Sequence, residues 1–349
     1  MNSLLDYSYD ELECILTEMG EPKFRAKQIY EGLYQGKSIS EISNISNDLK
    51  QKLLQKFCDY PLSIHTKLVG KDGTIKYVYK LSDGNLIEGV LLSYNYGNTL
   101  CVSTQVGCRM GCKFCASTLG GLIRNLTAGE ILAQVLFVNR ENKGDLKNRK
   151  VTNIVLMGSG EPLDNYDNVL KFLKLVSNDD GINISQRNIS LSTCGLCDKI
   201  KQLADENLGI TLTISLHAPN DDIRKSMMPI ANRYSIKEIL EAIKYYFNKT
   251  KRRIVFEYSL VSGVNDSLDS ADELIKLLKG FACHVNLIPL NDVKERSLIG
   301  TNRKKAYAFM DRLISGGISA TVRRTMGSDI EGACGQLRNK ILRGDTWLV

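Results

Sequence analysis

Three cysteines stand close together near the middle of the chain, in the order Cys108-x3-Cys112-x2-Cys115. Thiolates are soft ligands that bind iron–sulfur clusters and zinc. An iron–sulfur cubane usually takes four cysteines, so a site with three leaves one iron with an open position for a substrate. Structural zinc takes four ligands, and Cys194-x2-Cys197 offers a second pair that would complete such a site. The spacing therefore predicts a metal centre, with iron–sulfur and zinc as the two alternatives.

The composition is that of an ordinary globular protein. Of the 349 residues, 43% are hydrophobic and 24% are charged, which suffices for one large domain and a smaller one. No apolar run is long enough to span a bilayer, and the N-terminus lacks a secretory signal. We therefore expect a cytoplasmic protein without membrane contact, whose ten cysteines serve metal binding or redox chemistry. Cys14 and Cys58 are expected to be small core residues.

The net charge of +7 arises largely near the end of the chain, where basic residues outnumber acidic ones from residue 292 to residue 349. A basic surface favours a polyanion such as RNA, although a solvated charged face explains the same excess equally well. The candidates for phosphate contacts are Arg303, Lys304, Lys305, Arg323 and Arg324.

The chain divides into four zones. Apolar residues at helical spacing predict a small helical accessory domain of three short helices over residues 1–65. Residues 66–97 alternate in polarity around a Ser82–Asn85 turn and predict a hairpin linker. Residues 98–325 repeat a strand–loop–helix unit six or seven times, which indicates an α/β fold with a full or partial β/α barrel. Residues 326–349 form a C-terminal segment.

Polar and glycine-rich segments follow the expected strands of the barrel. The strands are expected at residues 100–103, 151–157, 188–191, 209–214, 254–260, 285–288 and 318–322. The carboxyl ends of parallel strands form one rim, where barrel enzymes place their active sites. The segments expected at that rim are 108–115, 158–162, 192–195, 215–218, 261–266 and 289–291. After the cysteines, Thr127 and Glu130 have the spacing of a capping box and predict the start of a helix.

The cysteine spacing, with Phe114 before the third cysteine, resembles the signature of the radical S-adenosylmethionine (SAM) superfamily. The segment 158–162, Gly-Ser-Gly-Glu-Pro, is similar to that superfamily's "GGE" segment. The resemblance implies a radical SAM partial barrel in which Cys108, Cys112 and Cys115 hold a 4Fe–4S cluster. SAM chelates the open iron and is cleaved to a 5′-deoxyadenosyl radical.

Further blocks resemble the RlmN/Cfr family of RNA methyltransferases along nearly the whole chain. The resemblance implies methylation of carbon 2 of adenosine in 23S rRNA, at the peptidyl-transferase centre, and in tRNA, at the adenosine 3′ of the anticodon. The alternative is methylation of carbon 8 of adenosine in 23S rRNA, as catalysed by Cfr. Pro162 favours RlmN, because Cfr-type sequences tend to have alanine at that position. The blocks are residues 22–28, 105–108, 124–127, 160–163, 215–218, 264–266 and 333–337.

The resemblance also implies three catalytic residues. Carbon 2 of adenine is not nucleophilic and cannot attack the methyl group of SAM, so Cys334 first takes a methyl group from one SAM and a second SAM supplies the radical. Cys101 then resolves the covalent RNA adduct through a transient disulfide with Cys334, and Glu88 accepts a proton. Taken singly, both cysteines also suit ordinary structural positions, and Glu88, in an apolar run, also suits a buried ion pair.

The remaining implications concern ligands and partners. A low-potential electron donor such as flavodoxin or ferredoxin is expected, and the chain is expected to be a monomer. Ser159 departs from the methionine often found there in RlmN proteins, and the family pattern assigns no role to Cys194 or Cys197. The residues that match the family's SAM contacts are Gly160, Glu161, Ser192, Ser215, Leu216, His217 and Asn291.

Overall fold

The structure is a computed structural model, and it describes residues 2–290, 297–324, 326–330 and 341. The chain begins with a helical region whose apolar side chains, spaced three and four residues apart, pack against one another. Ser8 and Ser46 cap two of its helices through their hydroxyl groups. Its elements are η1 (Leu4–Asp6), α1 (Tyr9–Glu18), α2 (Phe24–Tyr34) and α3 (Asn47–Lys56).

A ten-stranded sheet forms the centre of the molecule, in the order β1-β2-β3-β4-β7-β8-β9-β10-β11-β12. The first four strands pair antiparallel, and the strands from β4 to β12 pair parallel. The antiparallel strands are β1 (Leu62–Val69), β2 (Ile75–Leu81), β3 (Leu86–Tyr94) and β4 (Gly97–Cys101). The others are β7 (Asn153–Leu156), β8 (Ile189–Thr193), β9 (Thr211–Ser215), β10 (Ile254–Leu260), β11 (Cys283–Pro289) and β12 (Ala320–Val322).

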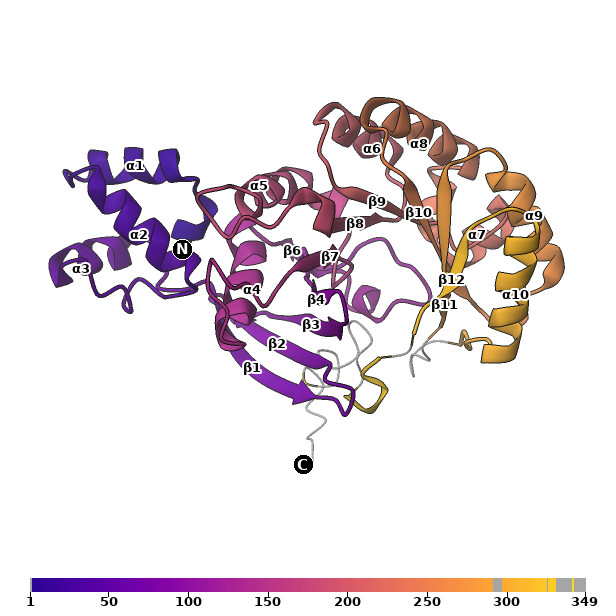
Figure 1. The fold of residues 1–349 in the computed structure, drawn as a ribbon, viewed down its shortest axis with the longest axis horizontal. Coiled ribbons are helices and arrows are strands. Elements are labelled where there is room, and N and C mark those ends of the chain that lie inside the picture. Colours follow the sequence, from indigo (N-terminus) through magenta and orange to yellow (C-terminus); the bar gives the residue numbers. More distant parts are fainter. Residues whose placement is uncertain (1, 291–296, 325, 331–340, 342–349) are drawn as a thin grey trace.

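Helices lie along the outer side of the curved sheet, and the sheet does not close on itself (Figure 1). Repeated strand–helix units with parallel pairing confirm the partial β/α barrel. Among the described residues, no helix is long and apolar enough to cross a membrane. The helices are α4 (Ala128–Glu141), α5 (Tyr166–Val176), α6 (Cys197–Asp205), α7 (Asp221–Met227), α8 (Ile236–Thr250), α9 (Leu268–Leu278) and α10 (Arg303–Ser315). Short 3-10 turns are η2 (Ala116–Thr118), η3 (Pro162–Asn165), η4 (Gln186–Asn188), η5 (Pro229–Asn232) and η6 (Ser328–Ile330).

Three local expectations were incomplete or wrong. The expected hairpin at 66–97 has a third strand, β1, which begins inside the zone 1–65 and makes the hairpin part of the main sheet. β1 is an edge strand whose side chains are mostly exposed or half-buried, so its apolar signal is weak. The cysteine loop lies inside a separate hairpin of β5 (Gln105–Gly107) and β6 (Leu122–Asn125). Cys14 is exposed and Cys58 half-buried, so neither is a core residue.

The helical region is fastened to the barrel by a salt bridge as well as by the common apolar core. Arg140 in α4 donates two hydrogen bonds of 2.7 Å to the carboxylate of Glu41 and one of 2.9 Å to the carbonyl of Gly36. This hydrogen bonding lowers the pKa of Glu41 to about 2. The fork of the guanidinium therefore fixes the helical region at one end of α4.

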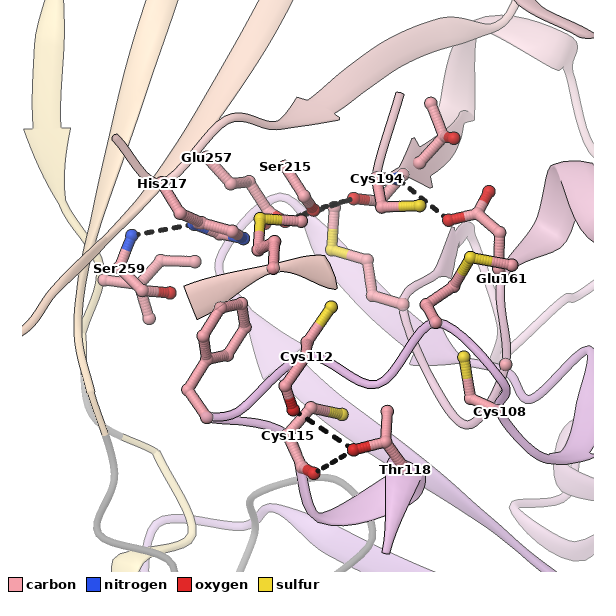
Figure 2. A pocket seen from close by; sticks show the side chains of 18 of the residues that line it. Cys108, Cys112, Cys115, Thr118, Glu161, Cys194, Ser215, His217, Glu257 and Ser259 are labelled. Carbon is pink, nitrogen blue, oxygen red and sulfur yellow. Dashed lines mark hydrogen bonds between the residues drawn. The ribbon is translucent and has the colours of Figure 1, made fainter. Parts of the chain in front are cut away.

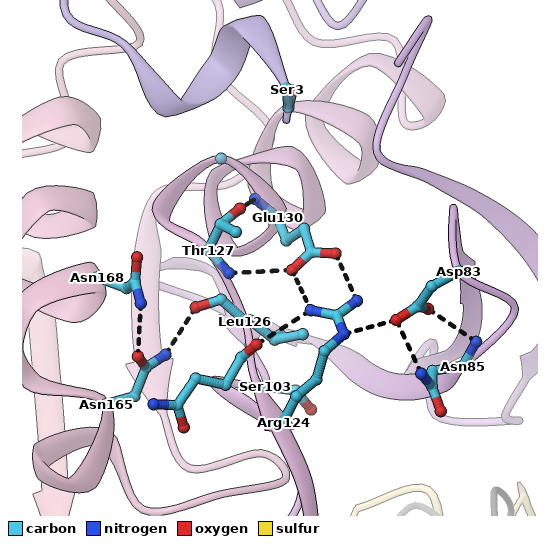
Figure 3. Close-up of polar contacts among 12 residues, drawn as sticks. Ser3, Asp83, Asn85, Ser103, Arg124, Leu126, Thr127, Glu130, Asn165 and Asn168 are labelled. Atoms are coloured by element: carbon cyan, nitrogen blue, oxygen red, sulfur yellow. Dashed lines mark hydrogen bonds and ion pairs between the residues drawn. The ribbon is translucent and has the colours of Figure 1, made fainter. Parts of the chain in front are cut away.

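A second arginine links the turn between β2 and β3 to the loop that carries the cysteines (Figure 3). Arg124 in β6 donates two hydrogen bonds, of 2.7 and 2.8 Å, to Glu130 and one of 2.6 Å to Asp83 in the turn after β2. Thr127 and Glu130 form the expected capping box at the start of α4. The network holds β6, the hairpin turn and the first turn of α4 together, and so anchors the far end of the cysteine loop.

Candidate active site

A cavity opens at the carboxyl ends of the parallel strands, at the rim where the sequence places the polar segments (Figure 2). It contains about 1130 Å³ of empty space, part of it open to solvent. We call it the cysteine cavity. Its wall includes Cys108, Met110, Cys112, Phe114, Cys115, Met157, Gly160, Glu161, Ser192, Cys194, Ser215, His217, Glu257, Ser259 and Arg323.

The β5–β6 hairpin closes the cysteine loop and fixes its path. Gly107 has a φ of 80°, and a Cβ there would lie 2.0 Å from the carbonyl oxygen of Gly121, so only glycine fits. The hydroxyl of Thr118 donates to the carbonyl groups of Cys112 and Cys115, at 3.1 and 2.9 Å. The sulfur atoms of the three cysteines of the loop point toward a common space (Figure 2).

The chemistry of this donor set fits a cluster better than a single ion. Burial raises the pKa of the Cys108 thiol to about 12 and raises that of Cys112 as well, so both remain neutral until a metal displaces their protons. Sulfur ligands of one zinc ion lie roughly 4.6 Å apart or less. No three Cys, His, Asp or Glu side chains of the described residues are close enough to hold one ion. A cubane places each thiolate on a different iron, so three cysteines can hold it while one iron keeps an open position.

Glu161 lies opposite the cysteines, in the loop after β7. Its carboxylate accepts hydrogen bonds from the N–H groups of Cys194 (2.8 Å) and Leu163 (3.0 Å), and burial raises its pKa. Gly160 has a φ of 109°, and a Cβ there would lie 2.6 Å from the Cβ of Gln105. The glycine therefore lets this loop pass close to β5, where Gln105 accepts a hydrogen bond from the N–H of Glu161 at 2.8 Å.

A carboxylate that the sequence patterns did not single out stands at the other side of the cavity. Glu257 in β10 is buried and accepts hydrogen bonds from the hydroxyl groups of Ser192 (3.1 Å) and Ser215 (3.5 Å). Its second oxygen, Oε1, is buried and finds no hydrogen-bond partner among the described residues. Burial raises the pKa of Glu257, against the opposing field of Arg323. An unpaired acceptor beside two serines suits a ligand that offers hydroxyl groups.

His217 is held as a neutral ring. Its Nδ1 accepts a hydrogen bond from the N–H of Ser259 at 2.9 Å, which leaves the ring proton on Nε2. Burial lowers its pKa from 6.5 to about 3. Its φ of 58° is unusual for a residue with a side chain, and Asn265 braces it by donating to its carbonyl oxygen at 2.7 Å. Phe114 packs edge-to-face against the ring, with centroids 4.9 Å apart.

Arg224 is a further residue that sequence reasoning missed. It is fully buried and donates to the carbonyl groups of Cys194 (2.6 Å), Leu216 (3.2 Å) and Tyr234 (3.3 Å). It thereby ties the loops after β8 and β9 together beneath the cavity. A lone arginine in an amphipathic helix is usually a surface residue, so no signal in the sequence marked it. Cys194 is buried in the cavity wall; Cys197 is also buried, at the start of α6.

One expected SAM contact does not line the cavity, and two expected site residues belong to parts of the chain that the structure does not describe. The Leu216 side chain packs into the main core, so only its backbone is near the rim. Asn291 and Cys334 lie outside the described residues. The other expected SAM contacts, Gly160, Glu161, Ser192, Ser215 and His217, all line the cavity.

Glu88 and Cys101 lie on one face of the antiparallel part of the sheet. Val90 pairs with Cys101 across β3 and β4, and Glu88 is two residues from Val90, so alternation places all three on the same face. Cys101 belongs to a small buried cluster against which Met157 packs, and Met157 also lines the cysteine cavity. The carboxylate of Glu88 forms a buried ion pair with Lys76 at 3.3 Å. The ion pair that the sequence left open is therefore present, and it places the carboxylate firmly.

Comparison with known proteins identifies the family. A family model for the radical SAM superfamily matches residues 102–278, and one for the N-terminal domain of ribosomal RNA large subunit methyltransferases matches residues 2–58. A "Probable dual-specificity RNA methyltransferase RlmN" of Clostridium novyi is 53% identical over 99% of this chain and 100% of its own length. This chain belongs to the RlmN family of radical SAM enzymes.

A further relative and a solved structure support the same family. An RlmN protein of Clostridium perfringens is 54% identical over 98% of both chains. The crystal structure of a radical SAM methyltransferase from Sphaerobacter thermophilus superposes with a TM-score of 0.92, at 41% identity, over 96% of this chain and 99% of that one. As a member of the RlmN family, the chain is a radical SAM RNA methyltransferase, and its cofactors are a 4Fe–4S cluster and SAM. The family and the fold expected from the sequence are both confirmed.

Proposed function

We propose that this enzyme methylates carbon 2 of adenosine in 23S rRNA and in tRNA, through a methyl group carried on Cys334. The dual-specificity relatives support the reaction and its two classes of RNA. The observation that carries the proposal is the position of Cys101. It belongs with Val90 and Leu92 to a buried cluster against which Met157 packs, and Met157 borders the cavity that contains the three cysteines of the loop. A second thiol beside the cysteine cavity is what the release of a cysteine-linked product requires.

In this proposal Cys108, Cys112 and Cys115 hold the 4Fe–4S cluster. The residues that would hold SAM are Gly160, Glu161, Ser192, Ser215, His217 and the backbone of Leu216, and Asn291 is a further expected contact. When bound there, the cluster and SAM supply a 5′-deoxyadenosyl radical. Glu161 would accept a hydrogen bond from the ammonium group of SAM, and Oε1 of Glu257 would accept one from the ribose of SAM. The neutral imidazole of His217 presents Nε2 as a hydrogen-bond donor.

The catalytic steps then fall to residues on the neighbouring sheet face. Cys334 would carry the methyl group to the base, and Glu88 would accept the proton that leaves carbon 2. The Cys101 thiolate would then attack the Cys334 sulfur, so that the S–S bond forms as the bond between this sulfur and the transferred carbon breaks. That carbon keeps the electron pair and takes up a proton, and the unpaired electron of the adduct would return to the cluster. Lys76 fixes the carboxylate of Glu88, since the two charges are buried together at 3.3 Å. The proposal includes a flavodoxin- or ferredoxin-like electron donor, a monomeric enzyme and a cytoplasmic location.

The test is mass spectrometry of nucleosides from rRNA and tRNA treated with the reduced enzyme and SAM. We expect 2-methyladenosine in both RNAs. Formation of 8-methyladenosine without 2-methyladenosine would overturn the assignment in favour of a Cfr-type reaction.

A variant tests the role of the methyl carrier. Cys334→Ala should abolish methylation of RNA while iron content and reductive cleavage of SAM stay at wild-type levels. Cys58→Ala, which alters a half-buried cysteine in the helical region, is the matched control and should methylate normally. Methylation by Cys334→Ala would exclude a methyl group carried on this thiol.

A further inference from the structure

A second cavity adjoins the cysteine cavity, and the activity described above does not account for it. It contains about 1020 Å³ of empty space, part of it open to solvent, near the amino ends of β7 and β8. Met157 and Arg323 line both cavities, so the two are neighbours within the barrel. We call it the tyrosine cavity, because Tyr94 and Tyr96 form part of its wall. The sheet face that carries Cys101 and Glu88 continues to Tyr94, since residues 88, 90, 92 and 94 alternate onto one side of β3.

The two tyrosines form a stacked pair at the mouth of this cavity. Their ring centroids are 4.9 Å apart and their planes differ by 7°. Tyr96 is 73% exposed, so most of its ring surface is available to a ligand. Because Tyr94 supports one face of Tyr96, the exposed ring is held in a fixed orientation. Such a ring offers a flat surface to a planar ligand.

The turn that carries Tyr96 is firmly built. Gly97 has a φ of 132°, and a Cβ there would lie 2.3 Å from the hydroxyl oxygen of Thr152. Both the N–H and the hydroxyl of Thr152 donate to the carbonyl oxygen of Asn98, each at 3.0 Å. The β3–β4 turn is therefore locked against the start of β7, which makes the tyrosine pair a preorganised surface.

The charges around the pair are of one sign. Arg187, Arg323 and Arg324 line the cavity with exposed side chains, and no aspartate or glutamate appears among its described wall residues. Guanidinium groups bind phosphate in a forked geometry. The amides of Asn153 and Asn286 also line the cavity and can both donate to and accept from the edge of a base.

Stacking rings, arginines and amides together are the features by which proteins bind unpaired nucleotides. A duplex hides its base faces and offers nothing to Tyr96. We propose that the tyrosine cavity is a subsite for a single-stranded nucleotide adjacent to the adenosine being methylated. Its base stacks on Tyr96 and its phosphate lies near Arg187 and Arg324. This inference rests on the proposed function, since it takes the RNA strand that enters the barrel as the ligand.

The test uses the holoenzyme and a single-stranded RNA oligonucleotide with one adenosine, flanked on either side by the fluorescent base 2-aminopurine. We expect binding to quench the fluorescence, because a stacked base is quenched. Tyr96→Ala should remove the quenching and raise the Kd of the oligonucleotide by about 5- to 100-fold. Tyr96→Phe and Tyr96→Trp should keep the quenching and the wild-type Kd, since stacking needs the ring and not the hydroxyl. Tyr307→Ala, at an exposed tyrosine in α10, is the matched control.

A second variant tests the phosphate contact. Arg324→Gln should lower the slope of log Kd against log salt concentration by about 0.7, the value for one phosphate contact on a single strand. Arg233→Gln, at an exposed arginine elsewhere, should leave the slope unchanged. An unchanged slope for Arg324→Gln would remove that residue from the subsite.

These outcomes separate the subsite from the reaction. SAM cleavage without RNA should be the same in Tyr96→Ala and in the wild type. If the wild type makes no 2-methyladenosine while the quenching still depends on Tyr96, the subsite stands and the reaction assignment fails. Wild-type affinity in Tyr96→Ala, a Tyr96→Phe variant as weak as Tyr96→Ala, or equal binding of a duplex oligonucleotide would each overturn the subsite.

Discussion

The cysteine cavity and the tyrosine cavity share Met157 and Arg323 but differ in construction. The polar groups of the cysteine cavity, such as Glu161, His217 and Glu257, are buried, and burial shifts the pKa of each toward its neutral form. The tyrosine cavity presents an exposed ring and exposed guanidinium groups.

The difference follows from what each cavity has to do. Radical chemistry requires that water be excluded and that ligands be fixed. The polar groups of the cysteine cavity are therefore buried and held by hydrogen bonds to neighbouring loops. A long RNA arrives from solvent and carries its own charges, so the groups that receive it can stay hydrated until it binds. Changes at residues that line only the cysteine cavity should therefore alter SAM cleavage and leave RNA affinity intact. Changes at residues that line only the tyrosine cavity should alter RNA affinity and leave SAM cleavage intact.

The largest expected effect comes from the cluster ligands. Cys112→Ala should lose bound iron and sulfide and all reductive cleavage of SAM, because an incomplete thiolate set cannot hold the cluster. Its affinity for the 2-aminopurine oligonucleotide should stay at the wild-type value. Iron analysis, anaerobic assay of 5′-deoxyadenosine and fluorescence titration measure the three quantities. A loss of RNA affinity equal to the loss of cleavage would show that the two cavities are not separate.

A smaller effect is expected for Glu257, whose Oε1 has no hydrogen-bond partner among the described residues. Glu257→Ala should raise the Kd of SAM about tenfold, as expected for the loss of a hydrogen bond to an acidic acceptor. The Kd of the oligonucleotide should not change. Calorimetric titration of SAM into the cluster-loaded enzyme measures the first value, with Glu241→Ala, at an exposed residue in α8, as the control. Unaltered SAM affinity would mean that Glu257 serves only to align Ser192 and Ser215.

The smallest effect concerns the pH dependence of stability. His217 has a pKa lowered from 6.5 to about 3 in the folded chain, so the unfolded chain binds its proton more readily. The stability from the neutral ring is present above pH 6.5 and is lost as the pH falls toward 3. Between pH 7 and 6 the loss should be about 0.7 kcal/mol, and His217→Gln should remove it. Denaturant unfolding of the cluster-free chain at both pH values measures the difference. An equal change in the free energy of unfolding between pH 7 and pH 6 in the wild type and in His217→Gln would contradict a buried neutral ring.

Much of the site could be predicted because its motifs are local. The spacing of Cys108, Cys112 and Cys115 and the glycines before Glu161 follow from loop geometry, which a short stretch of sequence determines. The partial β/α barrel was also predictable, since alternating strand and helix patterns along the chain imply a parallel sheet.

Other parts depended on contacts distant in sequence. Glu257 and Arg224 look like ordinary strand and helix residues, and their roles appear only where β8, β9, β10 and α7 meet. β1 was missed because an edge strand with one exposed face carries little apolar signal.

By itself, the sequence determined the family, the cluster motif and the succession of strands and helices, since each is encoded in residues near one another along the chain. Only the tertiary structure decided which groups share a cavity. It placed Cys101 and Glu88 on one sheet face, joined Glu257 to Ser192 and Ser215, and brought the two stacked tyrosines into one cavity wall with three arginines. Those groupings depend on strand pairing and burial between segments far apart in the chain, which no local pattern specifies.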